Sequence, residues 1–276
     1  MVQNKTYFPN LDGLRSLAFL AVFLGHCFSA NTVLVKQSDA YQWAISFFRL
    51  GGLGVSFFFV LSGFLITFLL LEEEKINGRI KVALFHMRRI LRIWPLYFAC
   101  ILFGFLVYPW ILQSLLNVSF IEPATFSWYL FFIGNFDVIN NGWPNTPTVK
   151  VLWSICVQEQ FYLVWAFLLF WVKSWRKAIM IGIIIISLLF RIYYSRSEDV
   201  LYLHTISIIS DMGVGGLLAL LTYLSPLFLN KLNHIKTYQI AVVYALGLIW
   251  FIFHKWWGVP VWLIPWVRLI YSFFFV

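Results

Sequence analysis

The first apolar run of the chain reads Leu11-Asp12-Gly13-Leu14-Arg15-Ser16-Leu17-Ala18-Phe19-Leu20-Ala21-Val22-Phe23-Leu24-Gly25-His26. At about 100° per residue, the eleven steps from Arg15 to His26 are three turns plus roughly 20°. The two side chains therefore share one face of a helix, about 16 Å apart along its axis. Ionisable groups are costly at membrane depth, and those present usually face a bundle interior or a watery cavity. The pair predicts a polar site inside a membrane protein.

The composition is that of a membrane protein. Apolar residues make up 62% of the 276 residues and charged residues 11%, with a mean hydropathy of +0.84, whereas a soluble domain carries about 25% charge. The net charge of +9 does not predict a nucleic-acid partner, because the basic residues concentrate in connections that the positive-inside rule assigns to the cytoplasm. Cys27, Cys100 and Cys156 stand singly in apolar segments, so we interpret them as packing residues and expect no metal site.

Long apolar runs recur along the chain, each of about 17–22 residues and able to cross a bilayer with some tilt. They predict an all-α polytopic membrane protein, a bundle of about eight transmembrane helices. The expected spans are residues 11–30, 50–71, 93–113, 151–172, 178–194, 204–224, 237–254 and 259–276. The last run is apolar up to Val276 and has no polar exit, so we expect a truncated or naturally shortened chain that forms a single domain over residues 1–276.

The orientation follows from the connection 72–92, which carries six of the basic residues: Lys75, Arg79, Lys81, Arg88, Arg89 and Arg92. The positive-inside rule places this connection and the N-terminus in the cytoplasm. The connection 114–150 then lies outside, provided that the apolar run 126–136 does not cross. Eleven residues are too few for an ordinary span and suit a re-entrant or interfacial helix. If the run does cross, every later orientation inverts and Lys173–Lys177 lies outside.

Two groups of residues could carry acid–base chemistry. His26, deep in a span, needs a partner or water, and an imidazole titrates near neutral pH as a general base does. Arg15 has an alternative role, because it could pair with Asp12 or extend to the headgroups. Glu159 lies about two turns into the apolar run that starts at residue 151. It either fixes helix packing as a hydrogen-bond partner or orients and charges the histidine, and both interpretations need it to face the interior.

Other polar or small residues have weaker signals. Gly52 and Ser56 are four apart, which favours close helix approach, and packing is the preferred interpretation of that segment over Ser62 as a nucleophile. Asp211, and Arg191 near a span end, are further polar candidates within spans, and Asp211 is expected to face the bundle interior. A basic group such as Arg88, Arg89 and Arg92 usually sets the membrane orientation and contacts lipid headgroups. The phosphates of a soluble donor would also bind at such a group.

Four segments occur in an order that resembles the acyltransferase 3 family of membrane proteins, which O-acylate sugars of the bacterial envelope. They are Leu11–Arg15 with an arginine–ten residues–histidine motif ending at His26, Gly54–Phe64, Arg88–Tyr97 and Leu152–Tyr162. Each segment is a weak signal alone, and the ordered set is specific. Together they cover roughly residues 7–165.

The resemblance implies an integral protein of the inner (cytoplasmic) membrane that uses acyl-CoA, commonly acetyl-CoA, as donor. The acceptor would be a hydroxyl of a cell-envelope glycan or lipid-linked saccharide. Arg88, Arg89 and Arg92 would bind the donor phosphates. His26 would act as general base or transient acyl carrier, Glu159 as its orienting or charge-balancing partner, and Arg15 would stabilise charge on the donor or the oxyanion.

The chain departs from the family pattern at several positions. Gln158 stands where paired glutamates are usual, and Ile209 stands where an arginine often precedes the residue matching Asp211. The family fold typically has about ten spans, so we expect C-terminal helices to be missing. Two other functions remain open. One is a transporter with a relay through Arg15, His26, Glu159 and Asp211, and the other is a catalytically degenerate family member.

Overall fold

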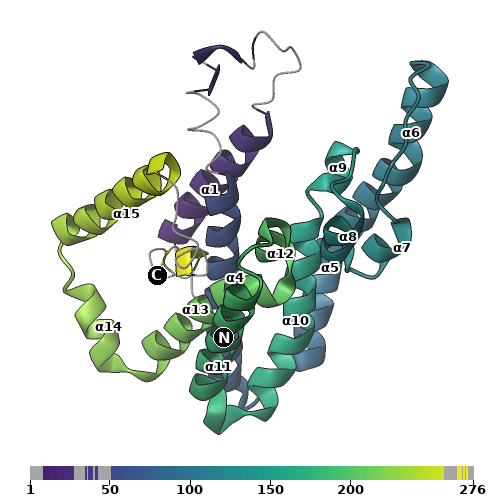
Figure 1. Cartoon of the computed structure of the whole chain (residues 1–276). Coiled ribbons are helices and arrows are strands. Elements are labelled where there is room, and N and C mark those ends of the chain that lie inside the picture. The colour runs from purple at the N-terminus through teal and green to yellow at the C-terminus, as the bar shows by residue number, and fades with distance from the viewer. Residues whose placement is uncertain are drawn as a thin grey trace.

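The structure is a computed structural model that describes residues 9–27, 35, 37–39, 41–42, 51–257, 266–268, 270 and 272. Within these ranges every regular element is a helix (Figure 1). The helices are α1 (Pro9–Cys27), α4 (Gly51–Asn77), α5 (Val82–Leu102), η1 (Phe103–Val107), α6 (Tyr108–Trp110), η2 (Ile111–Leu115), α7 (Phe126–Leu130), α8 (Gly134–Asn141), α9 (Pro147–Lys150), α10 (Trp153–Trp171), η3 (Lys173–Trp175), α11 (Arg176–Tyr193), α12 (Glu198–Leu203), α13 (Thr205–Leu224), α14 (Pro226–Asn233) and α15 (Thr237–Trp257).

Four helical stretches within the described ranges are long and apolar enough to cross a membrane. They are Gly54–Asn77, Val82–Leu115, Pro147–Trp171 and Glu198–Leu224. Helices α1, α11 and α15 also form where spans were predicted. The predicted span 259–276 falls mostly outside the described residues. The all-helical class is therefore confirmed for the described chain, whereas the count of about eight spans stays a prediction.

The core of the assembly is the contact between α4 and α13, in which glycines bring the two backbones together. A Cβ atom added at Gly63 would collide with the carbonyl of Met212, and one added at Gly215 would collide with the carbonyl of Val60. Larger side chains would hold the helices apart, so these glycines set their separation. The packing interpretation of the segment 51–64 is confirmed at Gly54 and Gly63, whereas a Cβ atom at Gly52 would make only ordinary contact with the ring of Tyr202 at 3.8 Å.

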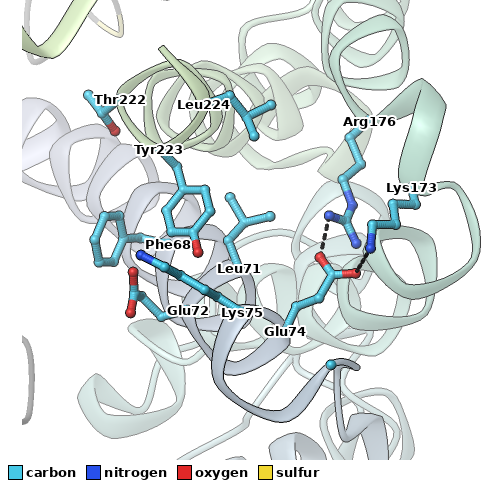
Figure 2. Close-up of a pocket in the computed structure, with 11 residues that line it drawn as sticks. Phe68, Leu71, Glu72, Glu74, Lys75, Lys173, Arg176, Thr222, Tyr223 and Leu224 are labelled. Atoms are coloured by element: carbon cyan, nitrogen blue, oxygen red, sulfur yellow. Dashed lines mark hydrogen bonds and ion pairs between the residues drawn. The ribbon is translucent and has the colours of Figure 1, made fainter. Parts of the chain in front are cut away.

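Two charged connections meet at one end of the helices. Glu74, near the end of α4, accepts a hydrogen bond from Arg176 of α11 at 2.6 Å and pairs with Lys173 of η3 at 3.1 Å (Figure 2). A pocket of about 650 Å³ at this end is also lined by residues 222–224, where α13 ends. The connections 78–81 and 172–175 therefore lie side by side, with α5 and α10 running away from them.

The run 126–136 does not pass from one end of the assembly to the other. It folds into α7 and the start of α8, and between them Phe132 has a positive φ of 57°. The amide of Asn135 donates to the carbonyl of Leu203 and to the hydroxyl of Thr205, both at 3.1 Å. Thr205 begins α13, a helix of 20 residues whose other end lies at the Glu74 pocket. This geometry agrees with the expected short, non-crossing helix.

The topology gives a labelling prediction. Asn77 at the end of α4 and Asn141 at the end of α8 are both exposed and lie at opposite ends of the helices. We introduce Asn77→Cys or Asn141→Cys after replacing the three native cysteines. A membrane-impermeant maleimide should label Cys at 141 in intact cells and Cys at 77 only after permeabilisation, because the positive-inside rule assigns the basic connection to the cytoplasm. Strong labelling at 77 in intact cells would reverse the whole orientation.

Candidate functional site

Glu159 is the centre of the candidate site. It lies on the inward face of α10 and is only 4% exposed. Its Oε2 accepts a hydrogen bond from the indole nitrogen of Trp94 on α5 at 3.0 Å. Its Oε1 is buried and has no hydrogen-bond partner within the described part of the chain. The prediction that Glu159 faces the interior is therefore confirmed, and one of its carboxylate oxygens is buried without a partner in the described chain.

The three predicted donor-binding arginines point in different directions. Arg89 is half-buried, and its guanidinium lies 5.5 Å from the ring centre of Phe85 and 5.2 Å from that of Tyr162. It lies close enough to Glu159 for the two charges to attract each other. Arg88 instead pairs with Glu73 at 3.4 Å, and its side chain is 60% exposed. Arg92 is exposed. The structure thus brings only Arg89 to the buried carboxylate.

Arg15 and His26 lie on α1, which is continuous over both residues, as the sequence predicted. This helix packs closely against α4, because a Cβ atom added at Gly54 would lie 2.8 Å from the carbonyl of Ala18. Arg15 is half-buried, whereas His26 is exposed near the end of the helix, within electrostatic range of Lys150 on α9. Among the described residues, no hydrogen bond or ion pair joins His26 to Glu159. Their catalytic pairing stays a prediction.

A second ionic cluster surrounds Asp211 on α13, which is fully buried as the sequence predicted. Its Oδ2 accepts a hydrogen bond from the Nε of Arg268 at 2.8 Å, and its Oδ1 accepts one from Ser272 at 2.6 Å. Arg191 of α11 is 4% exposed and interacts electrostatically with this group. Asp211 therefore has its ionic partners at Arg268 and Arg191, and position 209 is Ile209.

Sequence reasoning gave no role to three residues of these clusters. Trp94 lies in the segment Arg88–Tyr97. Its role could have been found from two facts: a buried carboxylate needs a hydrogen-bond donor, and the indole of tryptophan has one N–H and acts as a donor only. Arg191 was noted only as a polar residue near a span end, and Arg268 is 57 positions from Asp211, so the signal for either as its partner was that a buried carboxylate requires one. No group of three or more His, Cys, Asp or Glu side chains suited to a metal ion occurs among the described residues.

Apolar helices that enclose a carboxylate beside an arginine define a polytopic membrane protein with an ionisable site between its helices. The chain belongs to the acyltransferase domain family, the acyltransferase 3 family, whose model matches residues 8–276. The resemblance drawn from the four sequence segments is thereby confirmed.

Two relatives illustrate the similarity. The chain is 34% identical over 183 residues to the peptidoglycan O-acetyltransferase OatA of Listeria monocytogenes, and 32% identical over 165 residues to the O-acetyltransferase OatA of Staphylococcus aureus. The alignments cover 63% and 57% of this chain but 26% and 24% of the relatives, so the chain spans about a quarter of their length. No solved structure matches the chain.

Proposed function

We propose that this acyltransferase moves an acetyl group from acetyl-CoA on the cytoplasmic side to a hydroxyl of a cell-envelope glycan. The observation that carries the proposal is the buried carboxylate of Glu159, held by Trp94 and faced by the charge of Arg89. The name of the Listeria monocytogenes relative supports a peptidoglycan acceptor. We further propose that residues 1–276 act as one domain in the cytoplasmic membrane, with the N-terminus inside.

The proposed reaction uses the two ends of α1. His26 removes the proton from the acceptor hydroxyl, and the alkoxide oxygen attacks the thioester carbonyl of the donor. Arg15 stabilises the negative charge of the donor or of the oxyanion. When the C–S bond breaks, the imidazolium returns the proton to the CoA thiolate, and the O-acetyl ester remains on the glycan. His26 could alternatively carry the acetyl group transiently between two such steps.

Glu159 has an electrostatic role in this proposal. A buried carboxylate favours a positively charged partner, so it would balance the imidazolium that forms on His26. The proposed topology supports this pairing, because His26 near the end of α1 and Glu159 near the start of α10 both lie toward the outer face. Arg89 lies on the cytoplasmic side of Glu159 along the two helices, where the phosphate-bearing part of the donor would approach.

The assay that tests the proposal uses purified protein in detergent with labelled acetyl-CoA and a peptidoglycan disaccharide. Transfer of label to the disaccharide supports the acetyltransferase. Proton-coupled uptake into vesicles without transfer supports the transporter instead, and neither activity supports a degenerate member. The three results are distinguished by assaying the same purified protein in detergent and after its reconstitution into vesicles.

The arginine cluster gives a binding prediction. Arg88→Ala combined with Arg89→Ala should weaken acetyl-CoA binding about tenfold or more without loss of folded protein, because guanidinium groups match phosphate geometry. Arg79→Ala is the matched control, since Arg79 is an exposed arginine of the same connection. Isothermal titration at rising salt should also show weaker binding to the wild type, because exposed ionic contacts are screened. An unchanged affinity of the double variant for acetyl-CoA would exclude the arginine cluster from donor binding and leave it only the role of setting the membrane orientation.

A further inference from the structure

The indole of Trp94 is fixed by an aromatic cluster. Its ring centre lies 5.2 Å from that of Phe132 and 5.8 Å from that of Phe98, which meets it edge-on. Phe132 in turn stacks on Tyr97 at 4.4 Å, and Tyr97 is 1% exposed. Packing on several sides restricts the rotation of a large ring. The single N–H of this ring is therefore directed to one place, the Oε2 of Glu159.

The carboxylate of Glu159 has two neighbours with different functions. Arg89 supplies positive charge, but its guanidinium lies over the rings of Phe85 and Tyr162. The hydrogen bond that the structure gives to the carboxylate comes from Trp94 alone, within the described ranges. The orientation of the carboxylate plane is thus set by the indole, and Oε1 is the buried oxygen without a partner in the described part of the chain.

We infer that Trp94 is a positioning residue for the transfer reaction. It holds Oε2 of Glu159 and so presents Oε1 to the N–H or O–H group whose proton moves during transfer. This inference rests on the proposed function, and it assigns to the basic segment of α5 a role beyond donor binding. A displaced carboxylate would still be buried and charged, but it would no longer meet its partner at hydrogen-bond distance.

The chain contains a matched control for the loss of a buried indole. Trp165 of α10 is 1% exposed, and its indole nitrogen donates to the neutral hydroxyl of Thr67 at 2.9 Å. Replacing either tryptophan with phenylalanine removes one indole hydrogen bond of similar length from the helix core. Only the hydrogen bond of Trp94 ends on Glu159. A difference in kcat between the two variants therefore reports on positioning and not on packing.

The experiment compares Trp94→Phe, Trp165→Phe, Glu159→Gln and the double variant Trp94→Phe with Glu159→Gln. Steady-state transfer from labelled acetyl-CoA to the peptidoglycan disaccharide gives kcat and KM. We expect Trp94→Phe to lower kcat about tenfold to a hundredfold, the loss typical of one hydrogen bond to a charged group, with KM for acetyl-CoA unchanged. Trp165→Phe should lower the apparent melting temperature and leave kcat unchanged. In the Glu159→Gln background, Trp94→Phe should have little further effect, because interacting residues are not additive.

Three results would overturn the inference while the wild type transfers acetyl groups. They are a Trp94→Phe variant with wild-type kcat, equal kcat losses in the two tryptophan variants, and a full additional loss in the double variant. A wild-type protein that transfers nothing would instead contradict the proposed function, and the inference with it. The two failures are therefore separate observations.

Discussion

Replacing His26 with alanine is expected to abolish acetyl transfer. A general base contributes about 100-fold to 10,000-fold to a rate, and no other histidine shares the α1 face with Arg15. Glu159→Gln should impair transfer severely but less completely, because it removes the balancing charge and leaves the imidazole in place. The measurement is transfer of labelled acetyl to a peptidoglycan disaccharide by purified protein.

The control for His26 is His234, which lies exposed after α14 and contacts the carbonyl of Asn230 at 2.7 Å. His234→Ala should keep full activity. Circular dichroism and size-exclusion profiles of all variants must match those of the wild type, so that lost activity is not lost structure. A fully active His26→Ala variant would exclude the histidine from the chemistry and favour a different base.

The second large effect is expected at Gly215. Because Gly215 has no side chain, the backbone of α13 lies against the carbonyl of Val60. A Cβ atom added at Gly215 would collide with that carbonyl and would lie 2.8 Å from the backbone nitrogen of Phe64. Backbone atoms cannot rotate away as a flexible side chain can, so Gly215→Ala must separate the two helices. We expect a loss of about 3 kcal/mol or more of stability, at the upper end of the range for overpacked cores.

The matched substitution for Gly215 is Gly182→Ala on α11, where a Cβ atom would meet nothing within 4 Å. Alanine is favoured over glycine inside a helix by about 0.5–1 kcal/mol, so this variant should be neutral or slightly more stable. Apparent melting temperatures in one detergent compare the two. Equal melting temperatures would mean that the α4–α13 contact is looser than the structure gives.

Much of the architecture could be predicted, because apolar runs and their lengths follow directly from the cost of burying polar backbone in a bilayer. The burial of Glu159 and Asp211 followed from the same physics. The partners of those carboxylates could not be predicted. A helical period tells which residues share a face, but it does not tell which other helix that face meets.

The arginine cluster shows the same limit at smaller scale. Arg88 and Arg89 are adjacent in sequence, so a helix directs them about 100° apart. One meets Glu73 of α4 and the other meets Tyr162 of α10, and nothing in the local sequence distinguishes these environments. Packing of the segment 51–64 was predicted, but several of its small residues offered equal opportunities, and only the positions of α1 and α13 select Gly54 and Gly63 and not Gly52.

The α4–α13 contact has a consequence for the order of synthesis. About 150 residues separate Gly63 from Gly215, so at about 5–20 residues per second the second glycine is made roughly 8–30 s after the first. The α1–α4 contact at Gly54 needs only residues already translated when α4 emerges. We therefore expect α1 and α4 to pack first and the α4–α13 contact to form once α13 has been synthesised. Until then the glycine face of α4 is open to the membrane's insertion and proteolytic machinery, and any substitution that delays closure lengthens that exposure in the cell.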